Sequence, residues 1–187
     1  MFPPRSHGER RFVARTPAAS ATGYSVALSA DGTRLAVGAN KGDGVNGIDS
    51  GNVRVFEYDG TDWVQLGGDV DGEAANDQSG WSVALSADGT RLAVGAIFNG
   101  GNSGHTRVFE YNGTDWAQIG EDIDGEDASD QSGASVALSA DGIRLAVGAY
   151  VNSGVNGANS GHARVYDVCS TNEPTPTPTR STTTPTR

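Results

Sequence analysis

The chain has 187 residues, with 23 Asp and Glu against 13 Lys and Arg, which gives a formal net charge of −10. Residues 21–169 hold 21 acidic and only 7 basic residues, and because such a surface repels phosphate backbones we expect no nucleic acid among the partners. The 27 glycines argue against long helices, and no apolar run is long enough to predict a membrane-spanning segment.

The first 19 residues form an Arg-rich arm that we predict to be disordered. Arg5, Arg10, Arg11 and Arg15 stand there against the single acid Glu9. The arm lacks the apolar segment of a secretory signal peptide. Either the chain is not exported by that route, or the true start of the protein is missing.

After the arm, one fifteen-residue stretch occurs three times. SVALSADGTRLAVGA at 25–39 returns unchanged at 82–96, and returns at 135–149 with Ile143 in place of Thr. Repetition at such a period predicts a repeat array or a propeller. The units differ in length at one place, a loop of ten residues at 40–49 and 150–159 but of six at 97–102.

Four strands are predicted in the first unit, at residues 24–29, 34–39, 52–58 and 63–67. Asp-Gly turns join the first pair and the last pair, because Gly tolerates positive φ. An acidic connector, GDVDGEAANDQSG, leads to the next unit. The first two strands are small or apolar on both faces, as in strands covered on both sides. Burial that decreases from the first two strands to the last two favours a propeller blade, and an open sandwich of hairpins is the alternative.

The units resemble FG-GAP repeats, the blades of integrin α-type β-propellers. Gly23-Tyr24-Ser25-Val26 and Gly80-Trp81-Ser82-Val83 match the start of that repeat, Val37-Gly38-Ala39 matches its end, and Val53–Tyr58 resembles its third strand. Ser replaces the Phe of the family motif at 79 and 132, and its Pro is also absent. SADGTRLAVG is similar to blades of WD40 and TolB-like propellers as well.

The resemblance implies an all-β fold, an incomplete β-propeller of four-stranded antiparallel blades. Blade 1 with its connector is expected at 20–80, blade 2 at 81–133, and a partial blade 3 at 134–169. Two full blades and most of a third cannot close a ring, so we expect a fragment of a longer protein or self-association through open sheet edges. The Thr- and Pro-rich residues 170–187 predict an extended linker or an O-glycosylated stalk.

Carboxylates recur at the same spacing in both connectors, and hard cations such as Ca²⁺ bind six to eight oxygens. The candidate ligands are Asp69, Asp71, Glu73, Asp77, Asp122, Asp124, Glu126 and Asp130. The spacing does not fit an EF-hand loop, and a solvated acidic loop is the alternative. The Ca²⁺ loop of FG-GAP propellers joins the first two strands of a blade, but here that join is a short Ser-Ala-Asp-Gly turn, in which Asp is expected to shape the turn.

Histidines and other reactive residues give weaker signals. His105 and His162 occupy equivalent positions, where we expect strand-end residues with one satisfied nitrogen; metal ligation is the alternative. No nucleophile elbow or phosphate-binding loop is present, so no catalytic residue is predicted. Asn112 begins an N-glycosylation sequon at a hairpin tip, which matters only if the chain is exported.

The leading interpretation is a non-enzymatic module for binding or adhesion, extracellular or at a cell surface, with a protein or glycan ligand. Variation confined to one loop per blade is how repeat proteins build a binding face. The predicted face consists of Asn40, Lys41, Asp43, Asn46, Asp49, Ile97, Phe98, Asn99, Asn102, Tyr150, Asn152, Asn156 and Asn159. A structural Ca²⁺-binding repeat and a fragment of a propeller-based hydrolase or lyase are the alternatives.

Overall fold

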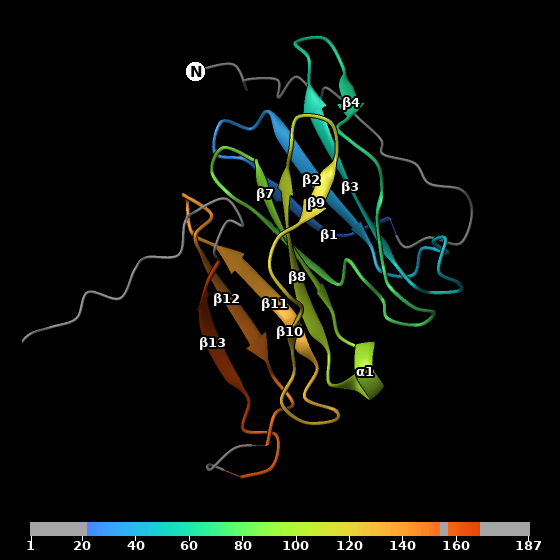
Figure 1. Ribbon diagram of the computed structural model, residues 1–187, viewed down its shortest axis with the longest axis vertical. Coiled ribbons are helices and arrows are strands. Elements are labelled where there is room, and N and C mark those ends of the chain that lie inside the picture. Colours follow the sequence, from blue (N-terminus) through green and yellow to red (C-terminus); the bar gives the residue numbers. More distant parts are fainter. Residues whose placement is uncertain (1–21, 154–156, 169–187) are drawn as a thin grey trace, which may run out of the picture.

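The computed structural model describes residues 22–153 and 157–168, which form three antiparallel sheets in chain order (Figure 1). Within these ranges the only helix is the single turn α1 (Asn99–Asn102). No helix there has the length and apolar character that crossing a membrane requires. The predicted arm at 1–19, the tail at 170–187 and Asn156 lie outside the described residues. The structure is therefore all-β and propeller-like.

Blade 1 is built from five strands. β1 (Thr22–Leu28), β2 (Arg34–Ala39) and β3 (Asn52–Tyr58) pair in sequence order, and β4 (Trp63–Gln65) and β5 (Val70–Asp71) both pair with β3. The two short strands share the outer side of β3, since β4 pairs with Phe56–Tyr58 and β5 with Asn52 and Val53. The fourth position of the blade is thus one strand interrupted in the middle.

The second and third units repeat this plan. Blade 2 consists of β6 (Ser82–Leu85), β7 (Arg91–Ala96), β8 (His105–Tyr111), β9 (Trp116–Gln118) and β10 (Ile123–Asp124). Blade 3 has three described strands, β11 (Ser132–Leu138), β12 (Arg144–Ala149) and β13 (His162–Asp167).

The predicted second and third strands of the first unit are confirmed at 34–39 and 52–58, and the first is shifted to 22–28. The fourth prediction is wrong at its end, because the strand stops at Gln65 and Gly67 adopts φ +75°. The chain leaves the sheet there and returns as β5, inside the segment predicted as a connector. Glycine adopts a positive φ at little energetic cost, so Gly67 allows the strand to be interrupted at this point.

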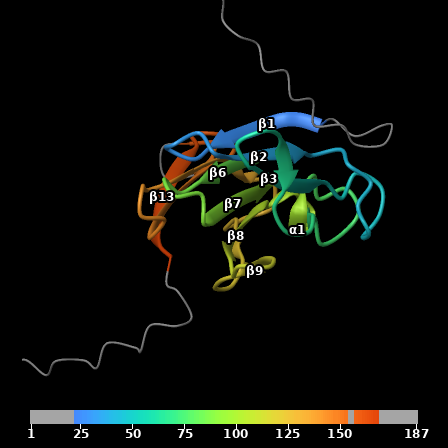
Figure 2. The ribbon, with the colours of Figure 1, turned by 90° about the horizontal axis from the view of Figure 1, so that it is seen from above.

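The sheets lie side by side, with blade 2 between the other two (Figures 1 and 2). Strand β6 packs against both β1 and β11, so the first strands of the blades gather together. One apolar core lies between blades 1 and 2, and a second between blades 2 and 3. Alternate residues of β7 enter the two cores: Leu92 and Val94 the first, Ala93 the second. Both faces of this strand are therefore covered, as its apolar sequence predicts.

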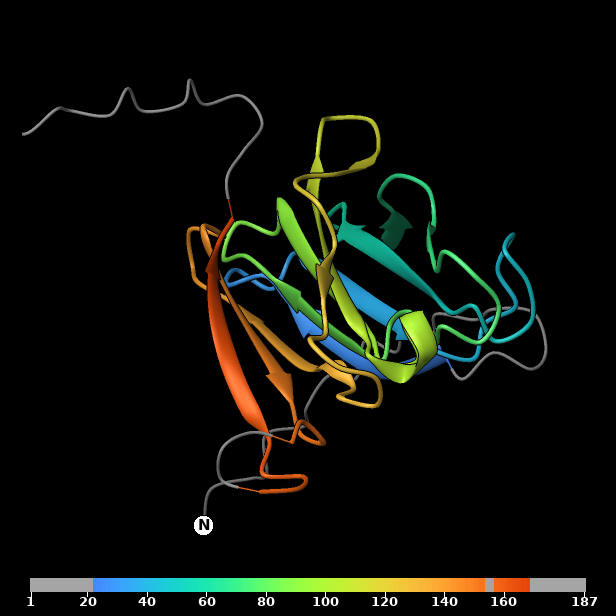
Figure 3. The same ribbon diagram turned by 60° about the horizontal axis from the view of Figure 1, so that its bottom comes forward.

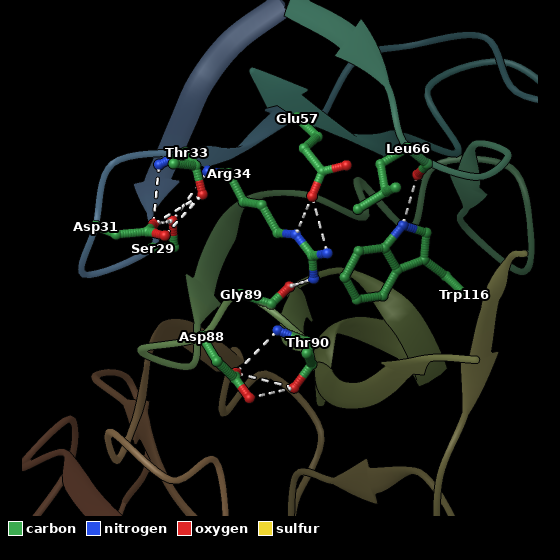
Figure 4. Close-up of polar contacts among 10 residues, drawn as sticks. All are labelled: Ser29, Asp31, Thr33, Arg34, Glu57, Leu66, Asp88, Gly89, Thr90 and Trp116. Atoms are coloured by element: carbon green, nitrogen blue, oxygen red, sulfur yellow. Dashed lines mark hydrogen bonds and ion pairs between the residues drawn. The ribbon is translucent and has the colours of Figure 1, made fainter. Parts of the chain in front are cut away.

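The repeated stretch contacts the next copy of itself. Ala30 N donates to Ala87 O at 2.8 Å, and Ala87 N donates to Ala140 O at 2.9 Å. The Arg34 guanidinium, paired with Glu57, donates to Gly89 O at 3.2 Å (Figure 4). Each blade is thus joined to the turn of its successor by backbone and arginine hydrogen bonds, which explains why the stretch recurs almost unchanged.

The same stretch brings neighbouring backbones into direct contact. Ser25 Oγ donates to Gly80 O, and Ser82 Oγ donates to Gly133 O, both at 2.7 Å. A Cβ on Gly38 would overlap Gly80 O and Ser25 Oγ, and a Cβ on Gly95 would overlap Gly133 O. Only glycine fits at these two strand positions, because any side chain would push the blades apart.

Two sheet faces remain exposed at the ends of the stack. Val26 and Leu28 of blade 1 are 63% and 59% exposed, whereas Val83, the counterpart of Val26, is 9% exposed. At the other end Val165 of blade 3 is 66% exposed. The open apolar surface is thus a pair of sheet faces rather than the sheet edges that the sequence suggested, and self-association stays a prediction.

The Asp of each Ser-Ala-Asp-Gly turn caps its own turn, as predicted. Asp31 Oδ1 accepts from Ser29 Oγ at 2.6 Å and from Thr33 N at 3.0 Å (Figure 4). The Ser29 hydroxyl and the Thr33 groups lower the pKa of Asp31 to about 2. Because the folded pKa lies below the ordinary value of about 3.9, the stabilisation is present above that value and is lost as pH falls towards 2.

Replacing Gly95 by Ala is expected to destabilise the fold by about 1–3 kcal/mol, because the added methyl would overlap the neighbouring blade. Gly68→Ala is the matched control, since the nearest atom to its added methyl is Asp115 Oδ1 at 3.4 Å. Urea unfolding measures both. Equal stabilities of the two variants would contradict the close approach.

A carbon-detected NMR titration of Asp31 should give a midpoint near pH 2. In the Asp31→Asn variant, the fall in stability between pH 4 and pH 2 should be smaller than in the wild type, because this carboxylate no longer titrates. A midpoint at or above the ordinary Asp value would show that the turn does not stabilise the charged carboxylate.

Candidate functional site

In blades 1 and 2, the loop between the second and third strands lies beside the connector to the next blade. Gln78 N donates to Asp49 O at 3.1 Å, and Gln131 N donates to Asn102 O at 3.1 Å. Figure 3 brings this side forward, with α1 in front and the hairpin tips pointing away at the top. We call this the loop side: residues 40–51, 72–81, 97–104, 125–131 and the described part of 150–161.

Two buried carboxylates brace the loop side. Asp77 accepts from Ala74 N at 2.8 Å and from Asn99 Nδ2 at 3.1 Å. Asp130 accepts from Asp127 N at 3.0 Å and from Asn152 Nδ2 at 2.7 Å. Asp77 and Asp130 were predicted as cation ligands, but their oxygens instead tie each connector to the loop of the following blade.

The predicted binding face is only partly at the surface. Asn40, Ile97 and Asn152 are buried, so they cannot contact a partner; Asn40 Nδ2 instead donates to Gln78 Oε1 at 3.2 Å. The half-buried members are Asp49, Phe98 and Asn99, and the exposed ones are Lys41, Asp43, Asn46, Asn102, Tyr150 and Asn159.

Sequence reasoning missed two largely exposed apolar side chains on this side, Val45 and Ile48. Their signal was an apolar residue within a loop of Gly, Asn and Asp, but the prediction favoured the polar residues of the loop. The backbone around them is held in place, since Ile48 O accepts from Asn76 N at 2.9 Å. The loop thus presents apolar groups from a braced backbone.

An aromatic row crosses from blade 1 to blade 2 on the loop side. The rings of Tyr24 and Trp81 have centroids 4.8 Å apart, and Phe98 meets Trp81 edge-on at 6.1 Å. Thr22 pairs with Ala39, the last residue of β2 before the loop. Trp81 N donates to Gly95 O, close to the end of β7. The aromatic row therefore lies at the end of the sheets from which the loops leave. Tyr24 is 48% exposed, and the other two rings are half-buried.

The connector carboxylates do not gather into the predicted series. Asp69 pairs with Arg54, with Nη2 and Oδ2 2.6 Å apart, and this pairing lowers the pKa of Asp69. Glu126 pairs with Arg164. Asp71 and Asp124 lie on β5 and β10, in ladder pairs with Asn52 and His105. The eight residues therefore do not form one Ca²⁺ loop per connector.

Instead, two of them meet a histidine across the boundary between blades 1 and 2. His105 Nδ1 lies 3.7 Å from Glu73 Oε2 and 3.6 Å from Asp122 Oδ2. Among the described residues, this is the one group of three metal-ligating side chains whose donor atoms lie within 4.8 Å of one another. We call it the Glu73–His105–Asp122 cluster.

The histidine of this cluster differs from its sequence-based interpretation. Its side chain is 0% exposed, and neither ring nitrogen has a hydrogen-bond partner. Burial, and then the charge of Arg107, lower the pKa of His105. Burial also raises the pKa of Glu73, against the opposite effect of Arg107. The cluster thus brings an imidazole and two carboxylates together, which is chemistry suited to a cation.

Asn112 stands at the exposed tip of the hairpin between β8 and β9, as predicted. Its side-chain oxygen accepts from Thr114 N and Asp115 N, both at 3.0 Å. The sequon is thus placed in a turn on the side away from the loops, and glycosylation of Asn112 stays a prediction.

No protein-family model and no curated protein matches the sequence. Solved structures do match. A putative 6-phosphogluconolactonase from Bacteroides uniformis is 17% identical with a TM-score of 0.54, over 79% of this chain and 37% of that one. TolB from Acinetobacter baumannii is 13% identical with a TM-score of 0.41, over 80% and 33% of the two chains.

Hydrazine synthase from Kuenenia stuttgartiensis is 17% identical with a TM-score of 0.43, over 66% of this chain and 29% of that one. The chain thus spans about a third of the length of these structures. Of the three likenesses, the one to the lactonase supports the fold, and at this identity it supports nothing further.

Asp77→Ala is expected to cost about 1–3 kcal/mol of stability, because it leaves Ala74 N and Asn99 Nδ2 without their buried acceptor. Hydrogen exchange should become faster in residues 97–104 in particular. The exposed Glu121→Ala serves as the control and should stay within about 0.5 kcal/mol of the wild type. Unchanged exchange in that loop would show that Asp77 does not brace it.

Proposed function

We propose that this chain is a non-enzymatic binding module that captures a protein or glycan partner on its loop side. The observation that carries the proposal is the aromatic row Tyr24–Trp81–Phe98, which is partly exposed and spans two blades. Rings of this kind offer a large apolar contact at little conformational cost, and Tyr and Trp are enriched where proteins bind partners.

Other residues of the loop side also support binding of a partner. Val45 and Ile48 are exposed apolar groups on a loop whose backbone is hydrogen-bonded to the connector. A braced loop loses little freedom on binding, so more of the contact energy remains as affinity. Asp43 and Asp49 stand near these groups in the sequence, and acidic groups around an apolar contact favour a partner with basic groups there.

The blade family and the number of blades are also part of this proposal. We take the chain as an incomplete β-propeller of FG-GAP-like blades, two full and most of a third, on the strength of the motifs at 23–26, 37–39 and 80–83. The Thr- and Pro-rich residues 170–187 and the exposed sequon at Asn112 support a place outside the cell or at its surface, in adhesion. Both features suit glycosylated, extended attachment of a binding module.

Tyr24→Ala tests this function with a matched control. Wild-type protein is applied to arrays of glycans and of purified extracellular proteins, and each ligand that it captures is titrated against the variants. Loss of the Tyr24 ring should weaken capture at least 10-fold, because an exposed aromatic anchor is removed. A double change, Val45→Ser with Ile48→Ser, should weaken it further if the partner reaches the loop.

Tyr58→Ala is that control, because Tyr58 also stacks at a tilt on a tryptophan, Trp63, with centroids 5.6 Å apart. It lies at the hairpin end, away from the loop side. Ligand capture should be the same as in the wild type. If Tyr24→Ala and the double variant capture every ligand as well as Tyr58→Ala does, the loop side is not the binding face.

A hydrolase is the second candidate, and one observation favours it: the structure with a TM-score of 0.54 is described as a putative 6-phosphogluconolactonase. The test is direct, since 6-phosphogluconolactone opens to an acid whose release can be titrated. We expect no turnover above the uncatalysed rate, in keeping with a binding module. Turnover by the purified chain would replace the binding proposal with this one.

A further inference from the structure

We propose that the Glu73–His105–Asp122 cluster binds one first-row transition-metal dication of the Zn²⁺ class and thereby ties blade 1 to blade 2. Glu73 comes from the connector that leaves blade 1, while His105 opens β8 and Asp122 precedes β10 in blade 2. A bound ion would therefore join two blades that are also held by apolar packing, hydrogen bonds and the ion pair of Arg107 with Glu73. This site is separate from the aromatic row that carries the proposed function.

The strongest indication is the buried histidine. Buried polar groups in folded proteins are nearly always hydrogen-bonded, yet both nitrogens of His105 lack such a partner. Nδ1 is directed at the carboxylates, 3.6 and 3.7 Å away, beyond hydrogen-bonding distance. An imidazole nitrogen and two carboxylate oxygens placed around a common point leave room for an ion between them.

The carboxylates are oriented by their other oxygens. Asp122 Oδ1 accepts from Gln118 Nε2 at 2.7 Å, which leaves Oδ2 facing His105. Glu73 Oε1 lies 3.6 Å from Arg107 Nη1, which leaves Oε2 facing the histidine. Partners of this kind fix the direction of ligands in metal sites. Arg107 brings one positive charge near the site, so two carboxylates and one guanidinium leave a net negative surrounding for a dication.

The donor set selects the class of metal. Ca²⁺ prefers six to eight oxygens, whereas Zn²⁺ and its neighbours accept imidazole and carboxylate together, with three protein ligands and an open position for water. Ligands about 2.0–2.1 Å from a tetrahedral ion lie about 3.4 Å apart. The two pairs that include His105, at 3.6 and 3.7 Å, approach that spacing, and the third pair lies within 4.8 Å. Glu73 and Asp122 are partly exposed, which gives them room to adjust.

The repeats indicate a single site of this kind in the described chain. Asn52 takes the place of His105 in blade 1, and it is buried and folded into β3. His162 takes that place in blade 3, where Glu126 and Arg164 pair as Glu73 and Arg107 do in the cluster. In the sequence, Thr179 stands as far after His162 as Asp122 stands after His105. One ion per chain is therefore the expected stoichiometry.

The experiment is calorimetric titration of the EDTA-treated, dialysed full chain with ZnCl₂, repeated with CoCl₂ for its visible absorption. Wild-type protein should bind one ion per chain and melt at a higher temperature as the metal is added. His105→Asn should weaken binding at least 10-fold and remove the Co²⁺ bands that arise from a nitrogen ligand. Asn is chosen because Asn52 shows that this strand position accepts it. Glu73→Gln should also weaken binding at least 10-fold.

His162→Asn is the control, since it removes the equivalent histidine of blade 3 and should leave the affinity unchanged. Melting temperatures in EDTA show that each variant is folded. The proposal is overturned by the absence of Zn²⁺ binding in the wild type, or by Zn²⁺ binding that His105→Asn and His162→Asn affect equally. It is also overturned if CaCl₂ competes at equal concentration, because that result indicates an all-oxygen site.

Discussion

The structure depends on the direct approach of neighbouring backbones at two glycines, Gly38 and Gly95. At each, the strand lies against the carbonyl of the glycine that opens the next blade, Gly80 or Gly133, and a serine hydroxyl donates to that same carbonyl. A side chain at Gly38 would open the core between blades 1 and 2, and one at Gly95 would open the core between blades 2 and 3. The sequence therefore repeats because each copy has to make the same contacts with the copy beside it.

The same approach determines where variation is allowed. Residues of the repeated stretch serve two blades at once: Arg34 pairs with Glu57 in its own blade and donates to Gly89 in the next. The loop after the second strand contacts the neighbouring connectors through backbone hydrogen bonds and through a few side chains, such as Asn99 on Asp77 and Asn152 on Asp130. Loop length can thus change from ten residues to six without moving the blades, and exposed side chains there are available for a partner.

Strands were predictable because their cause is local. The alternation of small and apolar residues and the Asp-Gly turns gave β2 and β3 their bounds, and the caps at Asp31 follow from the same pattern. The interruption between β4 and β5 was not visible, because pairing with β3 resumes after a turn at Gly67. Asn40 and Ile97 looked like loop surface, but both are buried, and Asn40 is bonded to Gln78 of the connector. The Glu73–His105–Asp122 cluster was missed because its members come from three separate segments and two blades.

The two ends of the stack show that the blade interface is directional. Val26 and Leu28 on the free face of blade 1 correspond to Val83 and Leu85, which blade 2 packs against the core shared with blade 1. The opposite face of a blade combines alanines with valines: Ala36, Val53 and Val55 of blade 1 lie in that shared core, with Ala27 packed against it. On blade 3, Ala146 and Val165 are the counterparts of Ala36 and Val55, and Val165 is 66% exposed. The two faces of a blade therefore differ, and each interface joins one face of each kind. The free face of blade 1 is of the kind that meets a preceding blade, and the free face of blade 3 is of the kind that meets a following one.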